Sequence, residues 1–138
     1  MKRFTAFLCV IAILALLTAC SGISFSLTAS NDHMTLDVKD AEDETFMESD
    51  YISVGKNRIA KVVSSLEKGQ IQVDFVEAAV FLHDDGTADV YPGDVYVTVT
   101  LGPDEDSAFE LPKGEYVVRF TSVGESSGKL TIDIEKKE

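Results

Sequence analysis

The sequence predicts an all-β protein, an antiparallel β-sandwich of about eight strands that follows an N-terminal helical signal peptide. Apolar and polar residues alternate through most of the chain after position 22, as they do in strands that bury one face. Groups of Gly, Pro, Asn and Asp separate the alternating runs at short intervals, which is typical of sandwiches. Helical connections of about 10–15 residues between the runs are missing, and this argues against a parallel sheet.

The expected strands follow one another with turn signals between them. The strongest runs from Val95 to Leu101, and its apolar residues at 95, 97, 99 and 101 are expected on one face. Asp84-Asp85-Gly86 predicts a tight hairpin turn, because Asp-Gly is a strong hairpin signal. The other strands are expected around Ile23, Phe25 and Leu27; Met34, Leu36 and Val38; Ile52 and Val54; Ile71, Val73 and Phe75; Val80 to Leu82; Ala88 to Tyr91; Phe109 and Leu111; Tyr116, Val118 and Phe120; and Leu130, Ile132 and Ile134.

Two segments interrupt the alternation. Residues 40–50 include six acids and no base, and they predict a long loop or one helical turn with Phe46 turned back toward the core. Residues 57–68 fit two structures. We favour a strand from 59 to 63 followed by a turn at 67–69, because the Val62-Val63 pair forms helices poorly. The alternative is a short helix near 57–68, which would make the fold α+β.

The run from Leu111 to Val118, with its partner strand, is similar to the closing hairpin of many extracellular sandwich modules. This similarity covers about a quarter of the chain that follows the leader. It implies a sandwich fold and no particular activity.

The chain begins with a secretory leader. Lys2 and Arg3 precede an apolar run from Phe4 to Ala19 that holds no charged residue, which is the pattern of a signal peptide. A permanent spanning helix needs about 20 apolar residues, and this run is shorter. An uncleaved membrane anchor and a buried core helix are the alternatives.

The leader ends in Leu17-Thr18-Ala19-Cys20, which resembles the lipobox of bacterial lipoproteins. The resemblance implies that the Cys20 thiol carries a diacylglyceryl group and that the chain is cut before Cys20. The expected organisation is a signal peptide at 1–19, a lipidated N-terminus and tether at 20–22, and a β-sandwich domain at 23–138. The protein would then sit on the extracytoplasmic side of the cell membrane or the outer membrane. A plain secreted protein is the alternative.

Composition narrows the classes of function. The full chain has a net charge of −12, and loss of Lys2 and Arg3 lowers it to −14. A surface this acidic repels phosphate backbones, so nucleic acid is not an expected partner. Cys9 leaves with the leader and lipid occupies Cys20, so no disulfide is expected within the domain. No cofactor is expected besides the lipid on Cys20.

The strongest metal candidate is calcium, which takes six to eight oxygen ligands. Asp84, Asp85, Asp89 and Asp94 form one candidate calcium site, and the acids at 104–106 form a second cluster. Neither spacing matches an EF-hand loop. Zinc needs three or four nitrogen or sulfur ligands, and the chain offers only two histidines and no free thiol.

The signals for catalysis and for ligand binding are sparse. His83 precedes Asp84, but no serine stands in a Gly-x-Ser-x-Gly setting. Tyr96 is the candidate binding residue, provided that it lies on the outward face of its strand beside Thr98 and Thr100. The alternative is an ordinary half-buried tyrosine.

These observations predict a non-enzymatic, membrane-anchored lipoprotein whose sandwich is a binding or interaction module. Its expected partner, besides the membrane that holds the lipid, is an envelope protein or an extracellular ligand. A calcium-binding domain that uses the acidic loops is the first alternative, and a small hydrolase is the second.

Overall fold

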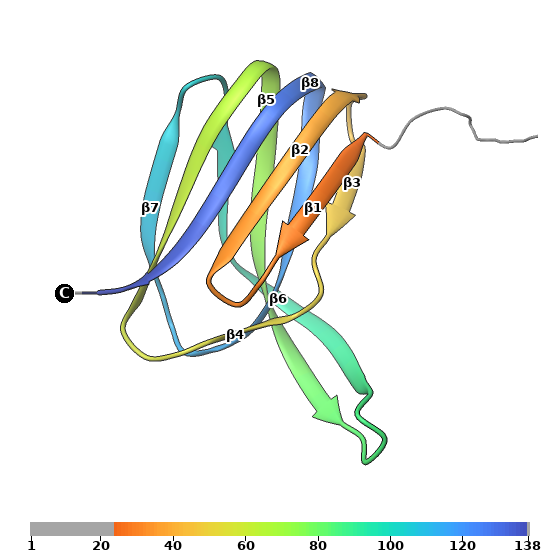
Figure 1. Ribbon diagram of the computed structural model, residues 1–138, viewed down its shortest axis with the longest axis vertical. Coiled ribbons are helices and arrows are strands. Elements are labelled where there is room, and N and C mark those ends of the chain that lie inside the picture. Colours follow the sequence, from red (N-terminus) through yellow and green to blue (C-terminus); the bar gives the residue numbers. More distant parts are fainter. Residues whose placement is uncertain (1–23, 138) are drawn as a thin grey trace, which may run out of the picture.

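A computed structural model describes residues 24–137 and shows eight antiparallel strands and no helix in that range (Figure 1). The predicted antiparallel β-sandwich is therefore confirmed. The predicted signal peptide, the lipobox and Ile23 of the first expected strand lie outside the described residues. The strands are β1 (Phe25–Ala29), β2 (His33–Ala41), β3 (Phe46–Glu48), β4 (Ile52–Val54), β5 (Arg58–Leu82), β6 (Ala88–Leu101), β7 (Asp106–Leu111) and β8 (Gly114–Lys136).

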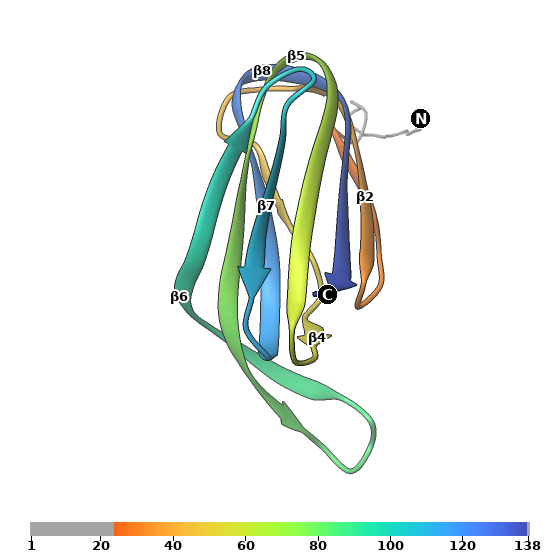
Figure 2. The same cartoon turned by 90° about the vertical axis from the view of Figure 1, so that its left-hand side faces the viewer.

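Two long strands, β5 and β8, fold one sheet into two layers (Figure 2). The first half of β5 pairs with the second half of β8, and β7, β2 and β1 complete that layer. The second half of β5 pairs with the first half of β8, and β6, β3 and β4 complete the other layer. No described helix is long and apolar enough to span a membrane.

The alternative of a helix near 57–68 is wrong, because this segment is the first part of β5. Val62 pairs with Ser107 of β7 on one side and with Ile132 of β8 on the other. A β-branched side chain fits such a central strand well, and it loses rotamer freedom in a helix.

The predicted turn at 67–69 is a bend inside β5, and a second bend lies at 124–128 inside β8. The pairing of these two strands shifts register between Leu66 and Gln70, where the sheet passes from one layer to the other. Gly69 has φ = +78° and Gly128 has φ = +133°, values that side chains rarely adopt. A Cβ at Gly69 would collide with the carbonyl of Glu125, and one at Gly128 would lie 2.5 Å from the Cα of Leu66. Both bends therefore require glycine.

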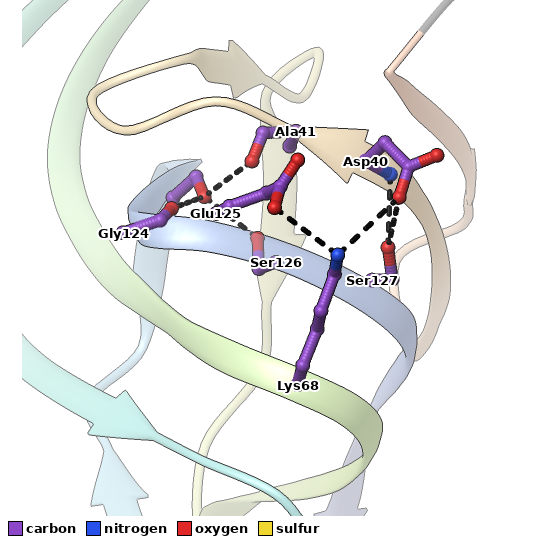
Figure 3. Close-up of polar contacts among 8 residues, drawn as sticks. Asp40, Ala41, Lys68, Gly124, Glu125, Ser126 and Ser127 are labelled. Atoms are coloured by element: carbon purple, nitrogen blue, oxygen red, sulfur yellow. Dashed lines mark hydrogen bonds and ion pairs between the residues drawn. The ribbon is translucent and has the colours of Figure 1, made fainter.

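Polar contacts fasten the bends to the end of β2 (Figure 3). Lys68 Nζ lies 3.1 Å from a carboxylate oxygen of Glu125 and 3.7 Å from one of Asp40. The hydrogen bond and charge of Glu125 hold the pKa of Lys68 above its ordinary value. Ser127 Oγ donates to Asp40 over 3.0 Å and accepts from the Asp40 N–H over 2.9 Å. These contacts join three strands at the end of the sandwich that holds the bends.

The core lies between the two layers, and the predicted alternation accounts for most of it. Phe75 is fully buried, and its ring centroid lies 5.3 Å from that of Phe109 and 6.4 Å from that of Tyr116. The predicted inward positions that are buried are Phe25, Met34, Leu36, Val38, Ile52, Val54, Ile71, Val73, Phe75, Leu101, Leu111, Tyr116, Val118, Phe120, Leu130, Ile132 and Ile134.

The segment at 40–50 departs from the prediction. It contains the short strand β3, and Phe46 is 62% exposed instead of turned to the core. In this strand Met47 packs against the core and its neighbours point outward. On the same outward face, Glu48 accepts a hydrogen bond from Arg119 Nε of β8 over 2.8 Å, and Nη2 of this arginine lies 2.7 Å from the same oxygen in an ion pair.

Candidate interaction surface

The last part of β5 and the first part of β6 form a hairpin that projects beyond the sandwich (Figures 1 and 2). Its turn is the predicted Asp84-Asp85-Gly86 sequence. The His83 N–H donates to the carbonyl of Thr87 over 2.8 Å, and the Gly86 N–H donates to the carbonyl of His83 over 3.1 Å. Asp85 accepts hydrogen bonds from the hydroxyl and the N–H of Thr87, which hold its pKa below the ordinary value. Hydrogen bonds among residues 83–87 therefore stabilise the turn.

Large apolar side chains are exposed on this hairpin. Phe81 is 59% exposed, Leu82 is 74% exposed and Tyr91 is 56% exposed. The rings of Phe81 and Tyr91 meet edge to face, with centroids 5.7 Å apart. Val95 and Tyr96, further along β6, are exposed as well. Scattered apolar residues are normal on a surface, whereas a group of five on two adjacent strands is typical of an interaction site.

The charge of the same region has one sign. From Gly69 to Pro112 the chain holds no Lys or Arg, and this range forms the second half of β5, β6 and β7. It holds ten acids: Asp74, Glu77, Asp84, Asp85, Asp89, Asp94, Asp104, Glu105, Asp106 and Glu110. The exposed apolar side chains therefore lie in an acidic stretch of the chain that has no cation of its own, although Glu110 pairs with Lys137 over 2.7 Å.

A bulge in β6 sets the position of Tyr96. Phe75 of β5 faces Val97 and the next residue, Val76, faces Val95, so Tyr96 is an extra residue in β6. Its ring lies 6.4 Å from that of buried Tyr116, and its hydroxyl donates to the carbonyl of Glu110 over 3.3 Å. Tyr96 thus connects the edges of the two layers and does not share the outward row of the strand's threonines, although 40% of it is exposed.

The same bulge corrects the prediction for Val95. Val97, Val99 and Leu101 turn toward the core as expected. Val95 lies beyond the extra residue and is exposed, because one inserted residue reverses the alternation of a strand.

Tyr116 lies next to Tyr96, and both its ring and its hydroxyl are held in place by neighbouring residues. It is 2% exposed, and its hydroxyl donates to the carbonyl of Pro112 over 2.7 Å. Burial, with the nearby charges of Glu77 and of the ionisable Tyr96 hydroxyl, raises the pKa of Tyr116 to about 12. This hydrogen bond fixes the turn that joins β7 to β8.

The four candidate calcium ligands lie along the hairpin. Asp84 and Asp85 lie in its turn, Asp89 follows on β6, and Asp94 lies near the base. Asp89 accepts a hydrogen bond from His83 over 2.8 Å, so the partner of this histidine is Asp89 and not its neighbour Asp84. Within residues 24–137, no group of three or more His, Cys, Asp or Glu side chains is placed to hold a metal ion.

The inner face of the hairpin borders a groove of about 410 Å³. Ala88, Val90 and Pro92 line one wall, residues 48–51 line the other, and Val117 lies at the base. One face of the hairpin thus borders residues 48–51, and Leu82, which pairs with Ala88, lies on that face. Phe81 and Tyr91 lie on the other face.

Comparisons with known proteins assign the chain to no family. No family model and no curated protein matches the sequence. A solved CBM4 structure is similar, with a TM-score of 0.42 and 10% identity over 79% of this chain and 74% of that chain. The cupin domain of CENP-C from Drosophila melanogaster is also similar, with a TM-score of 0.36 and 9% identity over 80% of this chain and 70% of that chain.

Proposed function

We propose that this chain is a lipid-anchored extracytoplasmic lipoprotein whose β-sandwich is a non-enzymatic interaction module, and that the projecting hairpin contacts its partner. The observation that carries the proposal is the pair of exposed rings of Phe81 and Tyr91 on one face of the projecting hairpin, with Leu82 exposed on the other face. Aromatic side chains in such positions supply most of the binding energy in many interfaces.

The position of the N-terminus supports this assignment. Phe25 at the start of β1 pairs with Val38, and Val38 pairs with Gly128 at the bend of β8. The hairpin projects from the opposite end of the sandwich (Figure 1). With lipid on Cys20, the five residues from Cys20 to Ser24 would reach at most about 18 Å. The bends would then face the membrane and the hairpin would point away from it, toward an envelope protein or an extracellular ligand.

The anchor and the interaction are tested separately. For the anchor, we expect the mature protein to begin at Cys20 and to carry a diacylglyceryl mass, and we expect Cys20→Ser to abolish both. Mass spectrometry of the membrane fraction measures this, and an unmodified Cys20 would exclude the lipoprotein assignment.

For the interaction, the tagged full chain is cross-linked in intact cells, extracted in detergent and purified. We expect one stoichiometric protein partner, with the cross-links on the hairpin. The double variant Phe81→Ser/Tyr91→Ser should lose the partner, and Phe46→Ser, which changes an equally exposed ring outside the hairpin, should retain it. Equal recovery with both variants would exclude the hairpin as the contact surface.

A further inference from the structure

The free edge of β6 lies beside the exposed aromatic residues of the hairpin. β6 pairs only with β5 and forms the outer strand of its layer (Figure 2). An edge strand presents unpaired N–H and C=O groups, which are a template for a further strand. Edge strands are usually protected by charged side chains, above all lysine. The stretch from Val95 to Leu101 has none, and its bulge at Tyr96 leaves Val97–Leu101 as a regular edge.

We propose that the partner binds through a basic extended segment that adds to β6 as a further strand. This inference rests on the proposed function and names the chemistry of the partner. Backbone hydrogen bonds along Val97–Leu101 would supply the register of the added strand, as in other cases of strand addition. Its first apolar side chains would continue onto Val95 and Tyr91, which are exposed at the hairpin end of the same strand.

Charge selects a basic segment. Acids lie at both ends of the template, with Asp94 before it and Asp104 and Asp106 after it. Asp74 lies beside its middle and accepts a hydrogen bond from Thr98 over 2.6 Å. Residues 69–112 contain no Lys or Arg, and the ion pair of Glu110 with Lys137 involves none of the acids at the ends of the template. Lysines or arginines of an added strand would neutralise Asp94, Asp104 and Asp106.

The same charges argue against a second copy of this chain as the occupant. Pairing β6 with β6 would bring two segments with ten acids each against one another. Neither segment would bring a Lys or Arg to the carboxylates of the other, which is unfavourable at an interface.

The other uncharged edge strands, β1 and β4, offer weaker templates. They have five and three residues, against 14 in β6, and neither carries Phe81 or Tyr91. β7, the edge of the first layer on the β6 side, carries Asp106 and Glu110. The long uncharged edge with adjacent apolar side chains belongs to β6.

The test uses the full chain in detergent and a labelled peptide of about nine residues that alternates Lys and Val, a length typical of a strand. A matched peptide carries Glu in place of Lys, and two others carry N-methyl groups at alternate backbone positions, one set for each edge of the strand. Fluorescence anisotropy measures affinity, and hydrogen exchange measures the protection of the β6 amides.

We expect the Lys peptide to bind and to weaken by about tenfold or more between about 50 and 300 mM salt. The Glu peptide should not bind, one of the two N-methylated peptides should weaken by about tenfold, and the β6 amides should gain protection. The variant Val95→Lys/Thr100→Lys should bind the Lys peptide about tenfold more weakly, while Phe46→Ser should bind it as the unaltered chain does.

Three results would overturn the inference: equal binding of the Lys and Glu peptides, unchanged binding of both N-methylated peptides, or a dimer joined through β6 in sedimentation experiments. The peptide controls decide the matter even where the lysine variant fails to fold, which its melting curve reveals. A partner cross-linked to the hairpin together with a negative peptide result would reject strand addition and leave the proposed function intact. A cross-linking experiment without any partner would reject the proposed function itself.

Discussion

The substitution Tyr116→Phe tests how the two layers are joined at the β7–β8 turn. It removes one hydroxyl, which is buried and donates to the carbonyl of Pro112 over 2.7 Å. A tyrosine that reaches back to the backbone a few residues upstream also fixes a corner in many sandwich domains. The loss of a hydrogen bond costs about 1 kcal/mol, and the carbonyl of Pro112 can bind water once the hydroxyl is gone, because Pro112 is exposed. We therefore expect a loss of about 1 kcal/mol in the free energy of unfolding.

Urea unfolding at pH 7, followed by circular dichroism, measures this loss, and Tyr96→Phe is the matched control. The Tyr96 hydroxyl also donates to a backbone carbonyl, that of Glu110, but over 3.3 Å and from a side chain that is 40% exposed. Water replaces such a bond, so the control should cost less than about 0.5 kcal/mol. Equal losses in the two variants would refute the argument that the hydrogen bond of Tyr116 contributes more to stability because Tyr116 is buried.

The pH dependence of stability gives a second measurement on the same residue. Burial raises the pKa of Tyr116 to about 12, against about 10 in the unfolded chain, so the native state holds the neutral hydroxyl. The unfolded chain releases this proton first, and stability falls as the pH rises from about 10 to 12. The contribution of Tyr116 is present in full below pH 10, and its loss amounts to about 2 kcal/mol. Tyr116→Phe should lack this part of the alkaline loss, and parallel curves for the two proteins would refute the assignment.

Two further predictions concern the bends and the hairpin turn. Gly69→Ala should lower the free energy of unfolding in urea by more than about 3 kcal/mol, because its Cβ would collide with the neighbouring strand. Gly86→Ala should lower it by only about 1 kcal/mol, because φ is +89° there but nothing lies within 4 Å of the new Cβ. Similar losses in the two variants would show that backbone strain, and not crowding, determines the cost. Saturating calcium should leave the melting curve unchanged, since Asp85 and Asp89 are engaged by neighbouring side chains; a stabilisation that Asp84→Asn abolishes would establish the calcium site.

Most of the fold could be predicted because alternation and turn residues act locally. The buried positions of β2, of the middle of β5 and of β8 follow directly from the period of two. The helix alternative arose because Ile59, Val62, Val63 and Leu66 lie at helical spacing, whereas in the strand Val62 and Leu66 are buried and Val63 is exposed. Pairing with β7 and β8 on either side decides between the two structures. Gly69 was predicted to end a strand, whereas a glycine with positive φ also allows a strand to bend and continue.

The candidate site was harder to predict, for two physical reasons. A bulge depends on the register between two strands, so the sequence of β6 alone placed Val95 on the inward face and left Tyr96 unplaced. The alternating apolar residues at the end of β5 look like any half-buried strand, and their exposure follows from the length of the hairpin relative to the opposite layer. The lack of Lys and Arg between 69 and 112 was visible in the sequence and was the available signal.

The acids around the hairpin explain how β6 can keep an open edge without pairing with a second copy of the chain. A long uncharged edge strand beside exposed aromatic rings is a template for aggregation. Here the repulsion among acids that surround the edge opposes the approach of a second copy, since every copy presents the same charge. The same charges attract a basic strand, so they select between the two occupants that an open edge admits. Substitution of Asp94 and Asp106 by Asn should therefore have two linked effects: weaker binding of the Lys peptide in anisotropy, and more self-association in sedimentation. If the variant binds the Lys peptide more weakly but does not self-associate more, or the reverse, the acids that protect the edge are not the ones that recognise the partner.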